Sequence, residues 1–166
     1  MLCKEASLGR VMKIHVVCVG KLKERFWKEA VAEYSKRLGG YVQLRVSEIP
    51  DRDPAKCGGE AKAREAEGGD ILKAVGATHM VLLAIDGTQR SSEQFAQRLD
   101  ALMVGGTSDV AFVIGGSTGV SPQVRARADE TLSFGPITLP HNLARVVLLE
   151  QVYRAFKIIR GEPYHK

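Results

Sequence analysis

The chain has 166 residues, the size of one compact domain, and 45% of them are hydrophobic while 26% are charged. This balance is typical of a globular protein with its own core, so it excludes disorder over most of the length. The uninterrupted apolar runs are short, such as residues 80–85, whereas a bilayer span needs ~20 consecutive apolar residues, so we expect no bilayer span. The net charge of +5 is unevenly spread: +5 over residues 1–39, −3 over residues 40–140 and +3 over residues 141–166. A chain that is basic at both ends can bind a polyanion where the ends meet in space, or the charge simply aids solubility.

The cysteines and the first residues bear on compartment and domain limits. Cys3, Cys18 and Cys57 form no C-x-x-C pair, so the sequence supports neither a zinc ribbon nor a disulfide framework. Residues 1–11 lack the apolar centre of a signal peptide. We therefore expect a polar N-terminal extension over residues 1–11, with Met12 as an alternative start, and a single domain over residues 12–166. The simplest expectation for location is the cytoplasm.

The chain begins with a predicted strand and a predicted helix. Residues 13–19 form a β-branched apolar run that Gly20 ends, which predicts a strand. Residues 24–38 carry apolar side chains four positions apart, which predicts an amphipathic helix that ends at two glycines. Its inner face is expected to hold Phe26, Ala30, Tyr34 and Leu38.

A second strand, a loop, a helix and a third strand follow. Residues 41–49 alternate apolar and polar side chains, which predicts a half-exposed strand, and the prolines and glycines of residues 50–59 predict a loop. Residues 60–75 predict a helix with a weak point at Gly68 and Gly69. Residues 80–85 form an apolar strand that Asp86 and Gly87 are expected to stop.

The second half of the chain repeats this alternation. Residues 91–103 predict a helix capped by Ser91 or Ser92, and residues 110–114 an apolar strand that a glycine-rich turn follows at residues 115–119. Ser121 and Pro122 open a short helix. Residues 137–139 are expected to form a last short strand and residues 142–160 a long terminal helix.

Alternating strands and helices predict the fold class and the place of a site. Two of the strands are apolar throughout, which is typical of a mostly parallel sheet with helices on both faces, so we expect one α/β domain. Ligands of such sheets bind beyond the carboxyl ends of the strands, where residues 83–87, 115–119 and 134–139 should converge. The glycine turn matches neither the dinucleotide-binding fingerprint nor a P-loop, and a plain strand-to-helix turn is the alternative.

The sequence contains no motif for binding a metal ion and none for the nucleophile of a hydrolase. The four histidines, His15, His79, His141 and His165, show no metal-ligand spacing and no accompanying carboxylate cluster, so no metal site is expected. No nucleophile motif of a hydrolase is present. His141 and His165 bracket the terminal helix, which can bring them to one site.

The terminal helix is unusually apolar. Twelve of the seventeen residues from 143 to 159 are apolar, so we expect its outer side to pack on a second copy of the chain, with burial inside one subunit as the alternative. Arg154 shares a helix face with Glu150 and Lys157, whereas Arg145 points to the opposite, apolar side. A guanidinium there needs an anionic or carbonyl partner.

Three stretches of the sequence resemble one protein family. They are MKIHVVCVGKLKERFWKEAVAEYSKRL from residue 12, FVIGGSTGVSP from residue 112 and TLPHNLARVVLLEQVYRAFKIIRGEPYHK from residue 138. Together they are similar to the RlmH family of SPOUT-class methyltransferases, the ribosomal RNA large subunit methyltransferase H enzymes. The resemblance covers residues 12–166.

The resemblance implies a fold, a reaction and partners. The fold is a SPOUT-type domain with a C-terminal trefoil knot, which forms a homodimer through the C-terminal helix region. The reaction is transfer of a methyl group from S-adenosylmethionine to N3 of a pseudouridine in 23S rRNA, within the large subunit or the assembled ribosome, without metal or membrane. A non-catalytic ribosome- or RNA-binding protein is the alternative, and a nucleotide-binding enzyme of another class is a third.

The resemblance also implies site residues. The cofactor would be bound by Leu83, Gly115, Phe134, Gly135, Pro136, Ile137, Thr138 and Leu139. The reaction needs N3 placed in line with the methyl group and a group that assists loss of the N3 proton. The candidates are Tyr153, Arg154, Tyr164 and His165, of which only a histidine has an ordinary pKa near neutrality. Which of them is the base, and which subunit supplies each, stays open.

Overall fold

The computed structural model describes residues 11–164, which form a five-stranded sheet in the order β2-β1-β4-β3-β5. All four strand pairings are parallel, as predicted. The strands are β1 Met12–Val19, β2 Val42–Ile49, β3 His79–Gln89, β4 Asp109–Ile114 and β5 Glu130–Ser133. The helices are α1 Arg25–Leu38, α2 Pro54–Cys57, α3 Glu60–Val75, α4 Ser92–Val104, α5 Pro122–Arg127 and α6 His141–Ile159. His165 and the predicted extension up to residue 10 lie outside the described residues.

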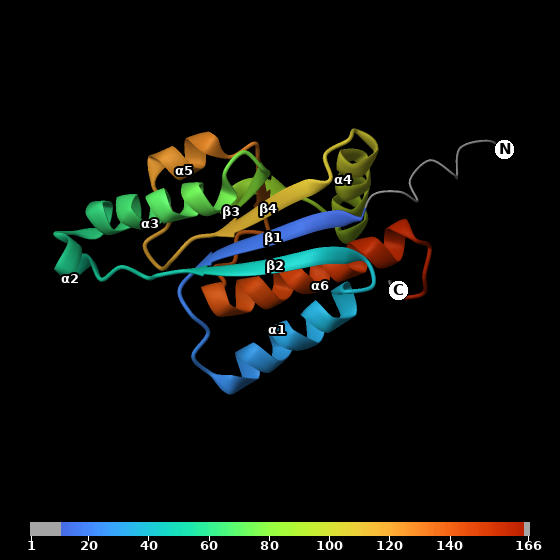
Figure 1. The fold of residues 1–166 in the computed structure, drawn as a ribbon, viewed down its shortest axis with the longest axis horizontal. Helices are drawn as coiled ribbons and strands as arrows, with labels where there is room; N and C mark the ends of the chain where they lie inside the picture. The colour runs from blue at the N-terminus through green and yellow to red at the C-terminus, as the bar shows by residue number, and fades with distance from the viewer. Residues whose placement is uncertain (1–10, 165–166) are drawn as a thin grey trace.

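Helices cover both faces of the sheet, which confirms the predicted fold class (Figure 1). Because side chains alternate across a strand, β1 supplies Ile14 and Val16 to one core and Val17 and Val19 to the other. The first core contains side chains of α4 and α6, and side chains of α1 pack against it. The second contains side chains of α3 and α5. The apolar runs of β1 and β4 are therefore explained by burial on both faces.

Three predictions about the elements are wrong. The loop predicted over residues 50–59 contains the short helix α2. Residues 137–139 form no strand, because the last strand is β5, where Leu132 pairs with Leu83 of β3. The chain leaves the sheet after Ser133 and passes through Pro136, which lacks a backbone N–H for the ladder. Asp86 and Gly87 also do not stop β3: the strand bulges between Leu83 and Thr88 and then pairs again with β5. A Cβ on Gly87 would lie 3.0 Å from the Leu132 backbone, so the glycine permits this close pairing.

Gly68 and Phe26 also depart from their predicted roles. Gly68 is not a simple weak point of α3, because a Cβ there would lie 2.4 Å from Oγ of Ser121, the N-cap of α5. The missing side chain allows α3 and α5 to pack closely. Phe26 was predicted on the inner face of α1 but is 60% exposed, and it lies against Trp27 in the first turn of the helix. Burial of α1 is instead concentrated near its end, at Leu38.

Helix α6 is largely covered within one chain. It contacts α1, α4, β1 and β4, and every one of its residues is buried or half-buried. Packing inside one subunit therefore accounts for much of its apolar character. The homodimer and the trefoil knot stay predictions. None of the helices between residues 11 and 164 has both the length and the hydropathy that a membrane span requires.

Candidate active site

A cavity of about 700 Å³, which we call the main cavity, lies beyond the carboxyl ends of β3, β4 and β5. Residues 83–86, 114–120 and 134–141 contribute to its wall, together with Leu132, Arg125 and Ala144. The three segments that were predicted to converge therefore do so. The reason is topological, because strands that are parallel and adjacent end at one edge of the sheet.

Most of the predicted cofactor residues share this cavity. Seven of the eight line it, namely Leu83, Gly115, Phe134, Gly135, Ile137, Thr138 and Leu139, whereas Pro136 does not. The loop after β5 turns at Gly135, whose φ of +106° favours glycine. Ser133 Oγ donates to the carbonyl oxygen of Ile85 and accepts a hydrogen bond from the Gly135 N–H, and this pair of hydrogen bonds fixes the start of the loop.

The glycine turn after β4 presents bare backbone to the main cavity. A Cβ on Gly115 would lie 2.7 Å from Val120 Cγ1, and one on Gly116 would lie 3.0 Å from Val19 Cγ1. Gly119 donates its N–H to the Gly116 carbonyl and has a φ of +82°, which closes the turn. The sequence alone left open whether these glycines were only a tight turn. The structure shows that side chains at Gly115 and Gly116 would not fit without rearrangement.

Beneath this turn lies a buried carboxyl group. Glu67 of α3 is 2% exposed and accepts a hydrogen bond from the Arg52 N–H, while its Oε2 has no partner among the described residues. A Cβ on Gly116 would lie 3.5 Å from that oxygen. Burial raises the pKa of Glu67, and the nearby Asp51 carboxylate raises it further. Glu67 therefore favours its protonated form more than an ordinary glutamate does.

Ionisable side chains on the wall of the main cavity are few. Arg125 of α5 forms an ion pair with Asp86 of β3, with 3.1 Å between Nη1 and Oδ2, and both side chains are largely exposed. His141, the first residue of α6, lies half-buried against Gly20, where a Cβ would approach its Nε2 to 3.2 Å. No sequence motif indicated Asp86 or Arg125, and His141 was predicted only to flank the terminal helix, which could bring it to one site with His165.

Arg145 anchors the loop after β1 to the start of α6. Its guanidinium is fully buried, and it donates to Glu48 Oε1 at 2.8 Å and to the Gly20 carbonyl oxygen at 3.0 Å. This confirms the prediction that the arginine needs an anionic or carbonyl partner. Burial favours a raised pKa for Glu48, but the Leu22 N–H and Arg145 together hold that pKa below its usual range.

Three of the four predicted catalytic residues lie together, in a group that we call the tail cluster: Tyr153, Arg154 and Tyr164, with Glu150. The rings of Tyr153 and Tyr164 meet edge to face with centroids 4.9 Å apart. The Arg154 guanidinium lies 4.7 Å from the Tyr164 ring centroid and pairs with Glu150 at 2.7 Å. Partial burial raises the pKa of the Tyr164 hydroxyl, and the Glu150 charge adds to the shift.

The tail cluster and the main cavity lie at opposite ends of α6. The cavity contacts His141 and Ala144 in the first turn of the helix. Tyr153 lies twelve residues after His141, or ~18 Å along the axis at the usual rise. Figure 1 shows the chain leaving α6 at the end far from the carboxyl ends of the strands. One copy of the chain therefore does not bring its own tail cluster to its own cavity.

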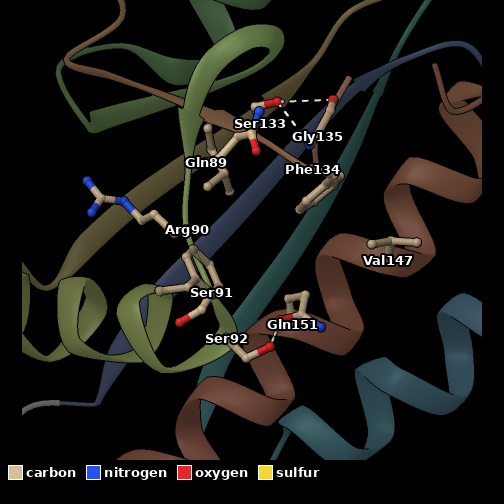
Figure 2. Close-up of a pocket in the computed structure, with 11 residues that line it drawn as sticks. Gln89, Arg90, Ser91, Ser92, Ser133, Phe134, Gly135, Val147 and Gln151 are labelled. Carbon is tan, nitrogen blue, oxygen red and sulfur yellow. Dashed lines mark hydrogen bonds between the residues drawn. The ribbon is translucent and has the colours of Figure 1, made fainter. Parts of the chain in front are cut away.

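A second, smaller cavity of about 370 Å³ adjoins the main one. The two share Leu132, Phe134 and Gly135, so the loop after β5 separates them. Figure 2 shows Ser92 next to Gln151, to which its hydroxyl donates at 2.7 Å, while Arg90 extends away from these side chains. Because Ser92 and Gln151 are bonded to each other and the volume is about half that of the main cavity, the main cavity is the better candidate for a ligand.

Neither His15 nor His79 approaches the main cavity. His15 Nε2 lies 2.8 Å from the Ser47 hydroxyl, and His79 Nε2 lies 2.8 Å from Glu130 Oε1 at the amino end of β3. Both imidazoles are therefore held by hydrogen bonds away from the cavity. Over the described part of the chain, no group of three or more histidine, cysteine, aspartate and glutamate side chains is arranged to hold a metal ion.

Comparison with known proteins shows the family to which the chain belongs. The family profile described as "Predicted SPOUT methyltransferase" matches residues 12–165. Proteins of Bacillus cytotoxicus and Bacillus thuringiensis named "Ribosomal RNA large subunit methyltransferase H" are each 52% identical over 159 residues, which is 93% of this chain and 100% of theirs.

Solved structures show the same fold at low sequence identity. A probable methylase family protein from Haemophilus influenzae has a TM-score of 0.56 at 16% identity, over 92% of this chain and 70% of that one. A probable methyltransferase from Bordetella pertussis has a TM-score of 0.56 at 13% identity, over 87% of this chain and 96% of that one. With its profile match, its 52% identical relatives and its parallel five-stranded sheet, the chain belongs to the SPOUT methyltransferase family, in the group of the ribosomal RNA large subunit methyltransferase H proteins.

Proposed function

We propose that this protein is a cytoplasmic, S-adenosylmethionine-dependent methyltransferase that methylates N3 of a pseudouridine in 23S rRNA of the large ribosomal subunit. The relatives at 52% identity carry the name of a large-subunit rRNA methyltransferase. The observation that carries the proposal is the main cavity, which gathers the loops after three parallel strands and seven of the eight residues expected to bind the cofactor.

The wall of the main cavity fits the cofactor. Its volume of about 700 Å³ lies within the ~300–1,000 Å³ of small-molecule sites. Leu83, Ile137 and Leu139 offer apolar surface to an adenine ring, and the bare backbone at Gly115 admits the methionine part. When bound, S-adenosylmethionine supplies a methyl group already activated by its positive sulfur. The protein's own residues then have to orient the target nitrogen, exclude water and take up a proton.

The complete site requires a second copy of the chain. In one copy, the tail cluster lies ~18 Å from the cavity end of α6. A two-fold dimer that places the terminal helices antiparallel would bring the tail cluster of one copy to the cavity of the other. Tyr153, Arg154, Tyr164 and His165 would then bind and orient the target nucleotide beside a cofactor held by the partner copy.

The loop after β1 is suited to contact RNA. Lys21, Lys23 and Arg25 are exposed, and the loop starts at Gly20, which lies against His141 of the main cavity. The Arg145 anchor holds this loop in place. Phosphate contacts would therefore form at the edge of the cavity, where they position the RNA without reading its sequence.

One experiment tests the reaction directly. Ribosomes that lack the modification are incubated with the protein and S-adenosylmethionine, and 23S rRNA fragments are analysed by mass spectrometry. We expect one added methyl group on a pseudouridine. Absence of that methyl group would refute the proposed reaction. Calorimetric titration then distinguishes the alternatives. Binding of S-adenosylmethionine without a response to ATP favours the methyltransferase over a nucleotide-binding enzyme of another class, whereas binding of neither ligand favours a non-catalytic RNA-binding protein.

A charge-matched pair of variants tests the RNA-binding surface. Neutralising Lys21, Lys23 and Arg25 to glutamine should weaken ribosome binding and reduce its salt dependence, while cofactor affinity stays unchanged. The control neutralises three exposed lysines on the opposite side of the sheet, Lys56, Lys62 and Lys73. Equal losses in the two triple variants would show that net charge alone, and not this loop, governs binding.

A further inference from the structure

His141 lies on the wall of the main cavity, and its imidazole has no hydrogen-bond partner among the described residues. It is the first residue of α6 and lines the cavity wall, and its ring lies against the backbone of Gly20. Unlike His15 and His79, which bond to Ser47 and Glu130, its ring nitrogens form no hydrogen bond with any residue between 11 and 164. A ligand in the cavity can therefore form a hydrogen bond with the imidazole without displacing a partner from residues 11–164.

The other ionisable groups of the cavity are poorly placed to accept a proton. Among the described residues that line it, the ionisable side chains are Asp86, Arg125 and His141. Asp86 accepts two hydrogen bonds from Arg125 and its side chain is 71% exposed, so this carboxylate is both paired and solvated. Behind Gly20, Glu48 and Arg145 are also paired with each other. Lys21, in the same loop, is an exposed cation.

We propose that His141 is a catalytic residue that accepts the N3 proton of the target base, an inference that rests on the proposed function. The N3–H bond breaks and its proton passes to the neutral imidazole. The electron pair left on N3 forms the new bond to the methyl carbon. The carbon–sulfur bond breaks with its electron pair remaining on sulfur, so the sulfonium becomes a neutral thioether and the positive charge ends on the imidazolium of His141.

The surroundings of His141 hold its ring in place. Gly20 has a φ of +91° and no Cβ, which leaves room for the imidazole at a distance where a side chain would crowd it. The Gly20 carbonyl is held by Arg145 and its N–H donates to the Ile49 carbonyl at 2.8 Å. Gly20 and Arg145 are therefore positioning residues, because they act on the proton acceptor through the loop backbone.

The test compares the wild-type protein with H141Q and H141A, and with H79Q as a histidine control at the opposite edge of the sheet. In single-turnover assays on ribosomes with saturating S-adenosylmethionine, we expect both His141 variants to lose ~100-fold or more of the methyl-transfer rate. Added imidazole should restore part of the rate of H141A, and the pH dependence of both variants should differ from wild type. The rate of H79Q should stay within about threefold of wild type, because His79 contacts neither the cavity nor the tail cluster.

A second measurement does not depend on activity. Diethyl pyrocarbonate acylates accessible imidazoles, and peptide mass spectrometry reports each histidine separately. S-adenosylhomocysteine should slow acylation of His141 and leave His79 unaffected. Two controls check each variant: thermal unfolding tests whether the fold is intact, and calorimetric binding of S-adenosylhomocysteine tests whether the cofactor site is intact.

The outcomes separate the inference from the proposed function. If wild-type protein does not methylate 23S rRNA, the proposed function fails, and this inference fails with it. If wild type methylates and H141Q stays within about threefold of its rate, the inference alone is wrong. The same holds if imidazole rescues H165A but not H141A, because the acceptor is then in the tail. A His141 that is acylated equally with and without S-adenosylhomocysteine also overturns it.

Discussion

Replacing Arg145 by methionine tests the anchor that joins α6 to the loop after β1. The substitution keeps most of the side-chain volume but removes two hydrogen bonds, to Glu48 at 2.8 Å and to the Gly20 carbonyl at 3.0 Å. Removing one partner of a buried ion pair costs ~3–5 kcal/mol. The Glu48 side chain is 33% exposed and can regain water, so the low end applies and we expect about 3 kcal/mol. The Gly20 carbonyl would remain without its buried donor, which supports a loss of this size.

The assay is chemical and thermal unfolding of R145M, followed by circular dichroism. A loss of about 3 kcal/mol corresponds to a fall of about 10 °C in the melting temperature of a domain of this size. E48Q and the double variant complete a cycle, in which the two losses should be less than additive because the residues share one interaction. A loss below ~1 kcal/mol for R145M would refute the reasoning, since it would mean that the buried guanidinium is replaceable by apolar contact.

Three further predictions follow from other parts of the structure. G115A should weaken S-adenosylmethionine binding at least tenfold, as measured by calorimetry, because the added Cβ would lie 2.7 Å from Val120 Cγ1. The control G40A, whose added Cβ has open space around it, should bind the cofactor as wild type does. Burial raises the pKa of Glu67 in the folded state, so the contribution of this side chain to stability is present at low pH and is lost as pH rises through that pKa. Measured by unfolding at several pH values, the unfolding free energy of E67Q should lack this loss. Burial raises the pKa of Cys18 to about 11, so iodoacetamide at neutral pH should label the partly exposed Cys57 and leave Cys18 unlabelled until the protein unfolds, as peptide mass spectrometry would show.

Local sequence patterns determined the elements and the fold class. The apolar runs at residues 13–19 and 110–114 became the strands β1 and β4, each buried on both faces. Residues 60–75 became α3 with the predicted bounds, and Ser121 caps α5 by accepting a hydrogen bond from the Val124 N–H. These features depend on side-chain periodicity and capping, which act within a few residues and can therefore be read from the sequence.

Errors arose where a local signal competed with a distant partner. Asp86 and Gly87 are typical turn residues, yet β3 continues past them because β5 pairs with it on the far side of the bulge. The segment 137–139 has strand-like residues, but it follows a proline in a loop that lines the main cavity. For β3, pairing with a segment about fifty residues away outweighed the local turn propensity of Asp86 and Gly87, and propensity alone does not contain that information.

For the candidate site, too, some features follow from the sequence and others only from the tertiary structure. The sequence by itself determined that Arg145 needs a partner, that three segments converge beyond the strands, and that the chain resembles one methyltransferase family. Only the tertiary structure decided that the partner is Glu48, 97 residues away, and that His141 lies on the cavity against Gly20. It also separated the tail cluster from the cavity by most of the length of α6. The physical reason is that burial and hydrogen bonding of a side chain depend on which distant segments the sheet order brings beside it.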